Sequence, residues 1–223
     1  MDNNSKTRIF PNRIYQCIII FFVVSCISVW PVAATQMPQD VSSLLMYGLM
    51  FMLSAITFLG FNWKNSKDLF REKQLPTVRA LILLALGFIA LPLAYYLFSL
   101  CIGINNSTAQ SNSYTIISML SIVIIGPVVE EFIFRGIFLR GLLTRYAPTI
   151  SIVATSLLFA IIHFNAAPEA SLTANVTEVS YALLMGLILG EIYYNSCSLF
   201  LCIILHILAN AVTLTLMSLH AFY

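Results

Sequence analysis

Charge is scarce in this sequence. Only 9% of its 223 residues are Asp, Glu, Lys or Arg, and the formal net charge is +2. Proteins that bind nucleic acid usually carry a concentrated basic patch, so this small and scattered positive charge excludes nucleic acid as a partner. Hydrophobic residues make up 60% of the chain, and the mean hydropathy is +0.92. A single soluble core cannot bury that much apolar surface, so the composition predicts a protein embedded in a lipid bilayer.

Patterns for disulfides, metal sites and repeats are also missing. The five cysteines lie mostly within apolar runs, with no CxxC or Cys/His spacing: Cys17, Cys26, Cys101, Cys197 and Cys202. We interpret them as small buried hydrophobic residues. There is no HExxH pair, internal repeat or low-complexity linker in the sequence. We therefore treat residues 1–223 as a single transmembrane domain.

Long apolar runs are what the sequence does contain. A helix that crosses a membrane needs about 20 mostly apolar residues. By that measure the chain is an all-α polytopic transmembrane bundle of about seven spans, near residues 14–34, 41–61, 80–104, 114–143, 149–165, 176–194 and 198–219. The fourth run is too long for one straight crossing and has Gly126-Pro127 in its middle. Because proline removes a backbone donor and disfavours helix at the preceding residue, we expect a kinked or broken helix there.

Basic residues predict the topology. They precede the first run and fill the connection between the second and third runs: Lys6, Arg8, Arg13, Lys64, Lys67, Arg71, Lys73 and Arg79. The positive-inside rule places both segments, and with them the N-terminus, in the cytoplasm. Residues 1–34 also resemble a signal peptide, because the apolar stretch ends in the small residues Val32-Ala33-Ala34. That stretch is long for a signal peptide, so we favour a retained anchor.

Two adjacent carboxylates and an arginine interrupt the fourth run: Glu130, Glu131 and Arg135. Ionisable groups at membrane depth cost about 2.5 to 3.5 kcal/mol each on insertion scales, and they usually face a protein interior or a water-filled cavity. Glu131 and Arg135 are four residues apart, so they can form an ion pair on one helix face. Glu130 is rotated from Glu131 by about 100°, which leaves it available as a general base. In the alternative interpretation, all three charges only extend to the cytoplasmic interface.

Sparse polar residues also mark the fifth and seventh runs. Phe159 and His163 are four residues apart, as are His206 and Asn210, so each pair shares a helix face. With a rise of about 1.5 Å per residue from the predicted cytoplasmic ends, the depths are about 22 Å for Glu130, 21 Å for His163 and 18 Å for Asn210. His206 comes out shallower, at about 12 Å. Three helices can therefore bring polar groups to a similar level.

These polar residues support hydrolysis by an activated water. A carboxylate and an imidazole, here Glu130 and His163, can deprotonate a water for attack on a carbonyl. An imidazole and a carboxamide, here His206 and Asn210, can donate hydrogen bonds to the developing oxyanion. This chemistry requires no cofactor. Zinc remains an alternative, because Glu130, His163 and His206 would also make a catalytic zinc set.

Taken together, three motifs resemble those of the CPBP or ABI family, which contains CAAX prenyl endopeptidases and bacteriocin-processing or immunity membrane proteins. They lie within residues 114–213 and read Glu130-Glu131-xxx-Arg135, Phe159-xxx-His163 and His206-xxx-Asn210. The resemblance implies a membrane-embedded endopeptidase of the cell membrane that acts on peptides or lipidated proteins. It also implies that the first glutamate and the second motif's histidine activate water, while the third motif supplies the oxyanion donors. The short chain favours the bacterial members, which are tied to peptide maturation, secretion or self-immunity.

Two other classes of function remain open. A bacteriocin immunity or binding protein can keep this fold without turnover. A transporter or proton relay also uses carboxylates and histidines within the membrane, although the absence of similar halves disfavours a repeat-built transporter. Neither the substrate nor the oligomeric state has a signature in the sequence.

Overall fold

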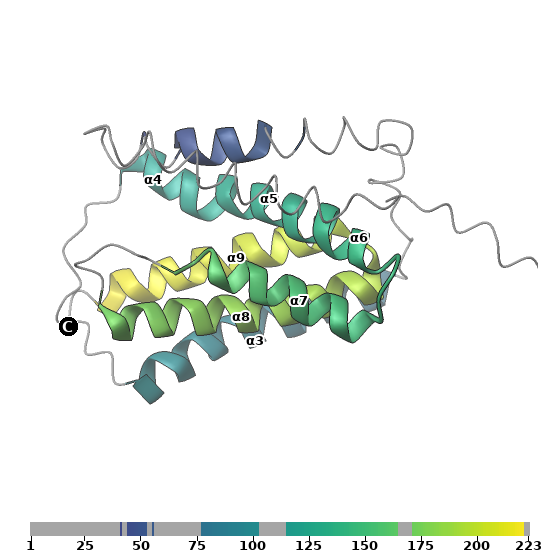
Figure 1. Cartoon of the computed structure of the whole chain (residues 1–223). Helices are drawn as coiled ribbons and strands as arrows, with labels where there is room; N and C mark the ends of the chain where they lie inside the picture. Colours follow the sequence, from purple (N-terminus) through teal and green to yellow (C-terminus); the bar gives the residue numbers. More distant parts are fainter. Residues whose placement is uncertain are drawn as a thin grey trace, which may run out of the picture.

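The structure is a computed structural model, and it describes residues 41, 44–52, 55, 77–102, 115–164 and 171–220. Within these residues the regular elements are all helical, which confirms the all-α class (Figure 1). Residues 44–52 form a helix that precedes α3 (Thr77–Ile102). A long helical segment then covers Ile116–Leu142, followed by α7 (Pro148–Ile161), α8 (Leu172–Ser196) and α9 (Leu199–His220).

Three of the described helices are long and apolar enough to cross a bilayer: Ile116–Leu142, Leu172–Ser196 and Leu199–Leu216. Helix α7 is apolar but shorter, and α3 contains 26 residues. The runs predicted at 80–104, 114–143, 149–165, 176–194 and 198–219 each coincide with one of these helices. Residues 14–34 and part of the run 41–61 lie outside the described residues. The total of seven spans, the cytoplasmic N-terminus and the choice between anchor and signal peptide therefore stay predictions.

The segment Ile116–Leu142, which corresponds to the fourth predicted run and is called the fourth helix below, changes its hydrogen-bond pattern along its length but remains continuous. It consists of α4 (Ile116–Leu120), a π-helical turn η2 (Ser121–Ile125), α5 (Gly126–Glu131), a second π-helical stretch η3 (Phe132–Leu139) and α6 (Arg140–Leu142). The Gly126 N–H bonds to the carbonyl of Ser121, five residues earlier, and Pro127 lies in the first turn of α5. The irregularity falls where it was predicted, but the helix is continuous rather than broken. A wider turn accommodates the proline here.

Close packing joins α7 and α8. A Cβ atom added to Gly186 would lie 2.9 Å from the Cβ of Ser156, and one added to Gly190 would lie 2.9 Å from Cγ2 of Ile152. Glycines at these positions let the two helices approach closely, as small residues do between membrane helices. Figure 1 shows α7, α8 and α9 side by side, with α4 to α6 running along one side of them and α3 along the other.

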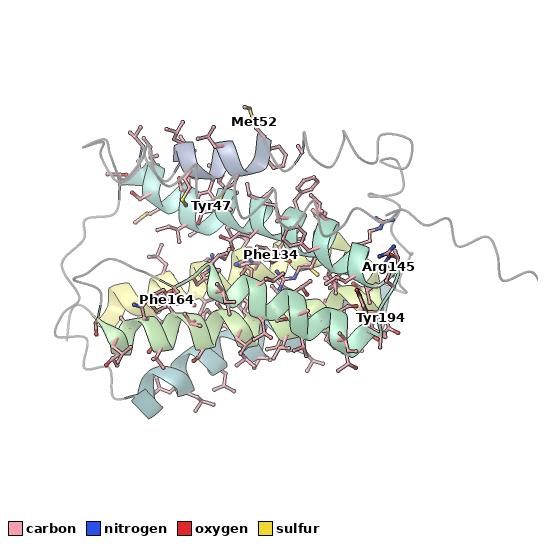
Figure 2. The ribbon with its side chains drawn as sticks, in the orientation of Figure 1. Tyr47, Met52, Phe134, Arg145, Phe164 and Tyr194 are labelled. Carbon is pink, nitrogen blue, oxygen red and sulfur yellow. The ribbon has the colours of Figure 1, made fainter. Side chains whose placement is uncertain are left out.

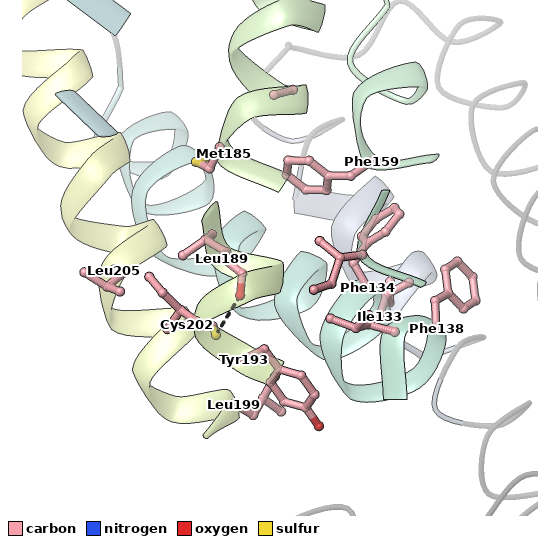
Figure 3. Packing of buried hydrophobic residues seen from close by; sticks show 14 of the residues in the cluster. Ile133, Phe134, Phe138, Phe159, Met185, Leu189, Tyr193, Leu199, Cys202 and Leu205 are labelled. Atoms are coloured by element: carbon pink, nitrogen blue, oxygen red, sulfur yellow. Dashed lines mark hydrogen bonds between the residues drawn. The ribbon is translucent and has the colours of Figure 1, made fainter. Parts of the chain in front are cut away.

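Aromatic rings fill the interior beside the fourth helix (Figure 3). The Phe134 ring meets the Phe159 ring edge to face at 5.0 Å and the Phe138 ring at 5.6 Å. Edge-to-face pairs of this kind add to the stabilisation from burial itself. All three side chains are essentially inaccessible. The ring of Phe159 therefore has a fixed position between the fourth helix and the remainder of the core.

Cys197 and Cys202 test the prediction that the cysteines are small buried hydrophobic residues. It is confirmed for Cys202, which is fully buried and donates its S–H to the Leu189 carbonyl at 3.6 Å (Figure 3). It is wrong for Cys197, which is exposed and ends α8 in a left-handed conformation with φ 53°. A turn between α8 and α9 requires that conformation, which the apolar pattern did not reveal.

Candidate active site

A buried cluster of charged side chains joins the fourth helix to α9, and it consists of Glu131, Arg135 and His206. Nη1 of Arg135 donates to Oε1 of Glu131 at 2.7 Å, and Nδ1 of His206 lies 2.8 Å from the same oxygen. The three side chains are 0 to 3% exposed. Nη2 of Arg135 donates to the Gly186 carbonyl at 3.2 Å, and its guanidinium carbon lies 5.0 Å from the centre of the Phe159 ring. The predicted ion pair is confirmed, and both of its members have additional partners. Within the described residues the other carboxylate oxygen of Glu131, Oε2, is buried without a hydrogen-bond partner.

His206 connects this cluster to Glu130. An ionised carboxylate such as that of Glu131 can only accept, so we assign a hydrogen to Nδ1 of His206. The other ring nitrogen, Nε2, lies 3.7 Å from Oε2 of Glu130. His206 therefore lies beside both carboxylates of the first motif, Glu130 and Glu131, although its estimated depth was the shallowest. One helical turn is only about 5.4 Å, so His206 and Asn210 can both reach one site.

Glu130 lines a cavity, and two side chains lie close to its carboxylate. Besides His206, the Tyr47 hydroxyl donates to its Oε1 at a long 3.4 Å. Gly126 makes room for this tyrosine, because a Cβ there would lie 3.0 Å from the phenol carbon and oxygen. A carboxylate has about four acceptor positions, so Glu130 keeps acceptor capacity after these contacts. Sequence reasoning missed Tyr47, since one tyrosine in an apolar run 83 residues away carries no pattern.

His163 lies two residues beyond the end of α7, and its own helix orients it. Its Nδ1 is 2.7 Å from the Phe159 carbonyl. A carbonyl can only accept, so we assign the hydrogen to Nδ1, which leaves Nε2 of the neutral ring with a lone pair. The Phe159 ring lies 4.6 Å from the His163 ring and 5.9 Å from the His206 ring. Phe159 therefore contributes a carbonyl that sets the tautomer of one histidine and a ring that packs against both.

A hydrogen bond joins Asn210 to the helical segment Ile116–Leu142. Its Nδ2 donates to the Ile122 carbonyl at 2.9 Å. The side chain is half-buried. A carboxamide has two N–H groups and one oxygen, so this bond leaves one N–H and the oxygen available for other partners.

The four predicted catalytic residues line one cavity of about 310 Å³: Glu130, His163, His206 and Asn210. A larger cavity of about 490 Å³ lies among α3, α7 and α8 and has mostly aliphatic walls. Figure 2 shows Tyr47, which lines the smaller cavity, near one end of the bundle together with Phe164, whereas Arg145 and Tyr194 lie at the opposite end. The three helices thus bring their polar groups together, as the depth estimates allowed.

A further carboxylate, Glu178, lines the same cavity and was missed from the sequence. It is exposed, and it interacts electrostatically with His163. On α8 it precedes Tyr181, Ala182 and Met185, which also line the cavity. The spacing i, i+3, i+4, i+7 defines one face of the helix. A carboxylate within the predicted run 176–194 was the available signal, because such groups are rare in spans.

Among the described residues, no group of three or more His, Cys, Asp or Glu side chains is arranged to hold a metal ion. Glu130, His163 and His206 do line one cavity. One nitrogen of each histidine is already occupied, by the Phe159 carbonyl and by Glu131. Each ring would have to bind a metal through its Nε2.

Fold and cavity together define a helical membrane protein in which carboxylates and imidazoles meet at a site lined by apolar helices. Residues 112–212 match the family model described as type II CAAX prenyl endopeptidase Rce1-like. This match to a family model of the CPBP family confirms the resemblance drawn from the three motifs. The family is one of membrane CAAX-type endopeptidases. No curated protein and no solved structure gives a significant match.

Proposed function

We propose that this protein is a membrane-embedded endopeptidase that hydrolyses peptide bonds in membrane-associated or lipidated peptides. One observation carries the proposal: Glu130, His163, His206 and Asn210 line a single cavity. Their roles follow from which atoms remain available after the contacts described above. A role in peptide or bacteriocin maturation, or in self-immunity, is the physiological setting that we propose for it.

In this mechanism Glu130 and His163 activate the water. Glu130 retains acceptor capacity, and the Nε2 of neutral His163 carries a lone pair, so a water between them can be held and deprotonated. The resulting hydroxide attacks the carbonyl carbon of the scissile bond. The proton then passes to the leaving amine when the tetrahedral intermediate collapses. Glu178, which interacts with His163, would stabilise the positive charge on that ring during the transfer.

Oxyanion stabilisation falls to His206 and Asn210. The second N–H of the Asn210 amide is available after its bond to Ile122. His206 can donate through Nε2 only when its ring carries both hydrogens, since Nδ1 donates to Glu131. The imidazolium and the Arg135 guanidinium would then balance the charges of the two carboxylates. A neutral group of four charges is acceptable in a dry interior, whereas an unbalanced one is not.

A zinc-dependent version of the same peptidase would use the same side chains. Glu130, His163 and His206 would hold the ion, and zinc would supply Lewis-acid chemistry there. Metal analysis of the purified protein and its response to chelators separate the two versions. One equivalent of zinc, with activity lost on chelation and restored by zinc, would establish the metal-dependent version.

The central experiment uses purified protein in lipid nanodiscs with fluorogenic peptides, prenylated and unprenylated. We expect cleavage that falls about 100- to 10,000-fold in Glu130→Gln and in His163→Ala, the range for removal of a general base. Glu191→Gln is the matched control, because Glu191 is exposed, contacts Asn195 on the same helix and does not line the smaller cavity that contains the four candidate residues. Unaltered cleavage in both test variants contradicts the proposal. Bacteriocin protection that survives both substitutions would instead indicate an immunity protein without turnover.

A further inference from the structure

The Gly126-Pro127 step takes away the regular helical donors of the Ile122 backbone carbonyl. In an α-helix the Ile122 carbonyl would accept from the Gly126 N–H, four residues later. Here the Gly126 N–H bonds instead to Ser121, in the π-helical register. In that register the donor for Ile122 would come from residue 127, which is proline and has no N–H.

Asn210 of α9 supplies the missing donor. Its Nδ2 lies 2.9 Å from the Ile122 carbonyl oxygen, across 88 positions of sequence. Ile122 lies in a helix long and apolar enough to cross a bilayer, and lipid offers a backbone carbonyl no donor, so a side-chain donor from α9 has a structural reason. Because a carbonyl can only accept, the NH2 of the amide must face it, which fixes the orientation of the amide.

We propose that Pro127 is a positioning residue for the oxyanion site. By lacking an N–H it keeps the Ile122 carbonyl available, and this carbonyl holds Asn210 in the orientation from which its second N–H donates to the oxyanion. The catalytic part rests on the proposed function, whereas the anchoring of Asn210 does not. The proposal also accounts for a helix-disfavouring residue in the middle of a span, three positions before Glu130.

A thermal-unfolding cycle tests the anchoring without any measurement of activity. Asn210→Ala in the wild-type background should lower Tm by about 2 to 4 °C, the shift expected for one lost hydrogen bond in a chain of this size. In the π-helical register that Gly126 follows, Pro127→Ala provides an N–H for Ile122, so adding Asn210→Ala to it should lower Tm no further. An equal decrease in both backgrounds overturns the proposal.

Two further variants keep this cycle interpretable. Pro127 is fully buried, so Pro127→Ala also leaves a small void, and Pro127→Val supplies the N–H with a volume closer to that of proline. The cycle is run in whichever of these backgrounds gives folded protein. Pro148→Ala in the first turn of α7 is the control, because a proline there removes no helical bond. In this control background Asn210→Ala should still lower Tm, and failure to do so contradicts the proposal.

Kinetics on the same proteins test the consequence for catalysis. We expect Pro127→Ala to lower kcat about 10- to 100-fold with little change in KM, because the Asn210 contact forms in the transition state. The double variant should be no slower than Asn210→Ala alone. Full kcat in folded Pro127→Ala, or losses that multiply in the double variant, overturn the positioning role. Wild-type protein that cleaves nothing contradicts the proposed function, and the unfolding cycle then decides the anchoring by itself.

Discussion

Glu130 and Glu131 are consecutive in the sequence and identical in chemistry, yet they belong to different regions of the molecule. Glu131 is fully buried in the cluster with Arg135 and His206, where two donors share one of its oxygens. Glu130 faces the cavity, with a long contact to Tyr47 and a 3.7 Å approach to His206. One residue of helix rotates a side chain by about 100°, which is enough to separate structural from chemical roles. Burial with short, charged partners favours stability, and spare acceptor capacity beside a cavity favours reaction.

Removing Arg135 should have the largest effect on the buried cluster. Arg135→Ala leaves Glu131 as a charge without its cation, which lowers the free energy of unfolding by about 3 to 5 kcal/mol. Both the amount of folded protein and the activity should fall, in contrast to Glu130→Gln, which should fold normally. Thermal unfolding and yield after extraction measure this, with Arg145→Ala in the exposed turn between α6 and α7 as the control. Normal folding of Arg135→Ala with only a catalytic loss would instead make Arg135 a direct participant.

His206 lies at the border of the two regions, and two substitutions separate its contributions. The amide nitrogen of His206→Asn replaces Nδ1, so the bond to Glu131 and the stability are largely kept while kcat falls about 100- to 1,000-fold. The amide nitrogen of His206→Gln replaces Nε2, so more activity should survive at a cost of about 1 kcal/mol in stability. Paired measurements of kcat and Tm check this. The same loss of activity in both variants, with the same Tm, would contradict the division of roles.

Packing behind the buried cluster should be the next most sensitive feature. Gly186→Ala places a Cβ 2.9 Å from the Ser156 Cβ and 3.0 Å from its Cα, and the carbonyl of Gly186 is a partner of Arg135. Overpacking of this kind lowers stability by about 1 to 3 kcal/mol. Gly48→Ala is the matched control, since nothing lies within 4 Å of the added atom. Equal Tm values for the two variants would show that α7 and α8 can separate without loss.

The smallest effect should come from the rim of the cavity. Glu178→Gln removes an exposed carboxylate that interacts with His163. We expect activity to fall less than about fivefold and the free energy of unfolding to change by less than about 0.5 kcal/mol, as is usual for exposed charges. Glu191→Gln on the same helix is the control, with no expected change in kcat. A loss as large as that in Glu130→Gln would move Glu178 from the rim to the reaction itself.

Local spacing explains which parts of this picture could be predicted. Apolar run lengths placed α3 and the helices from Ile116 to His220, and the four-residue spacing of Glu131 and Arg135 predicted an ion pair that the structure confirms. The Gly126-Pro127 irregularity was predicted at the right position, although not its π-helical form. These features depend on residues within one or two helical turns of each other. Relations between residues that close in the sequence can be inferred from the sequence itself.

Contacts between helices could not be predicted in the same way. The bond of His206 to Glu131 spans 75 positions, that of Tyr47 to Glu130 spans 83, and that of Asn210 to Ile122 spans 88. A soluble helix reveals its inner face by the contrast between apolar and polar sides. Helices in lipid are apolar on both sides, so their rotation and neighbours carry little trace in the pattern.

By itself, the sequence determined that this is a helical membrane protein with an Rce1-like set of motifs, because run length, composition and the order of a few polar residues carry that information. Helical spacing already predicted which carboxylate is paired with Arg135, but only the tertiary structure decided that Glu131 is also bound by α9 and that Glu130 faces the cavity. It also decided that His206 joins the two regions and that Asn210 is bound to a carbonyl exposed by a proline. Those outcomes depend on helix rotation and crossing, which are set by packing between segments far apart in the chain.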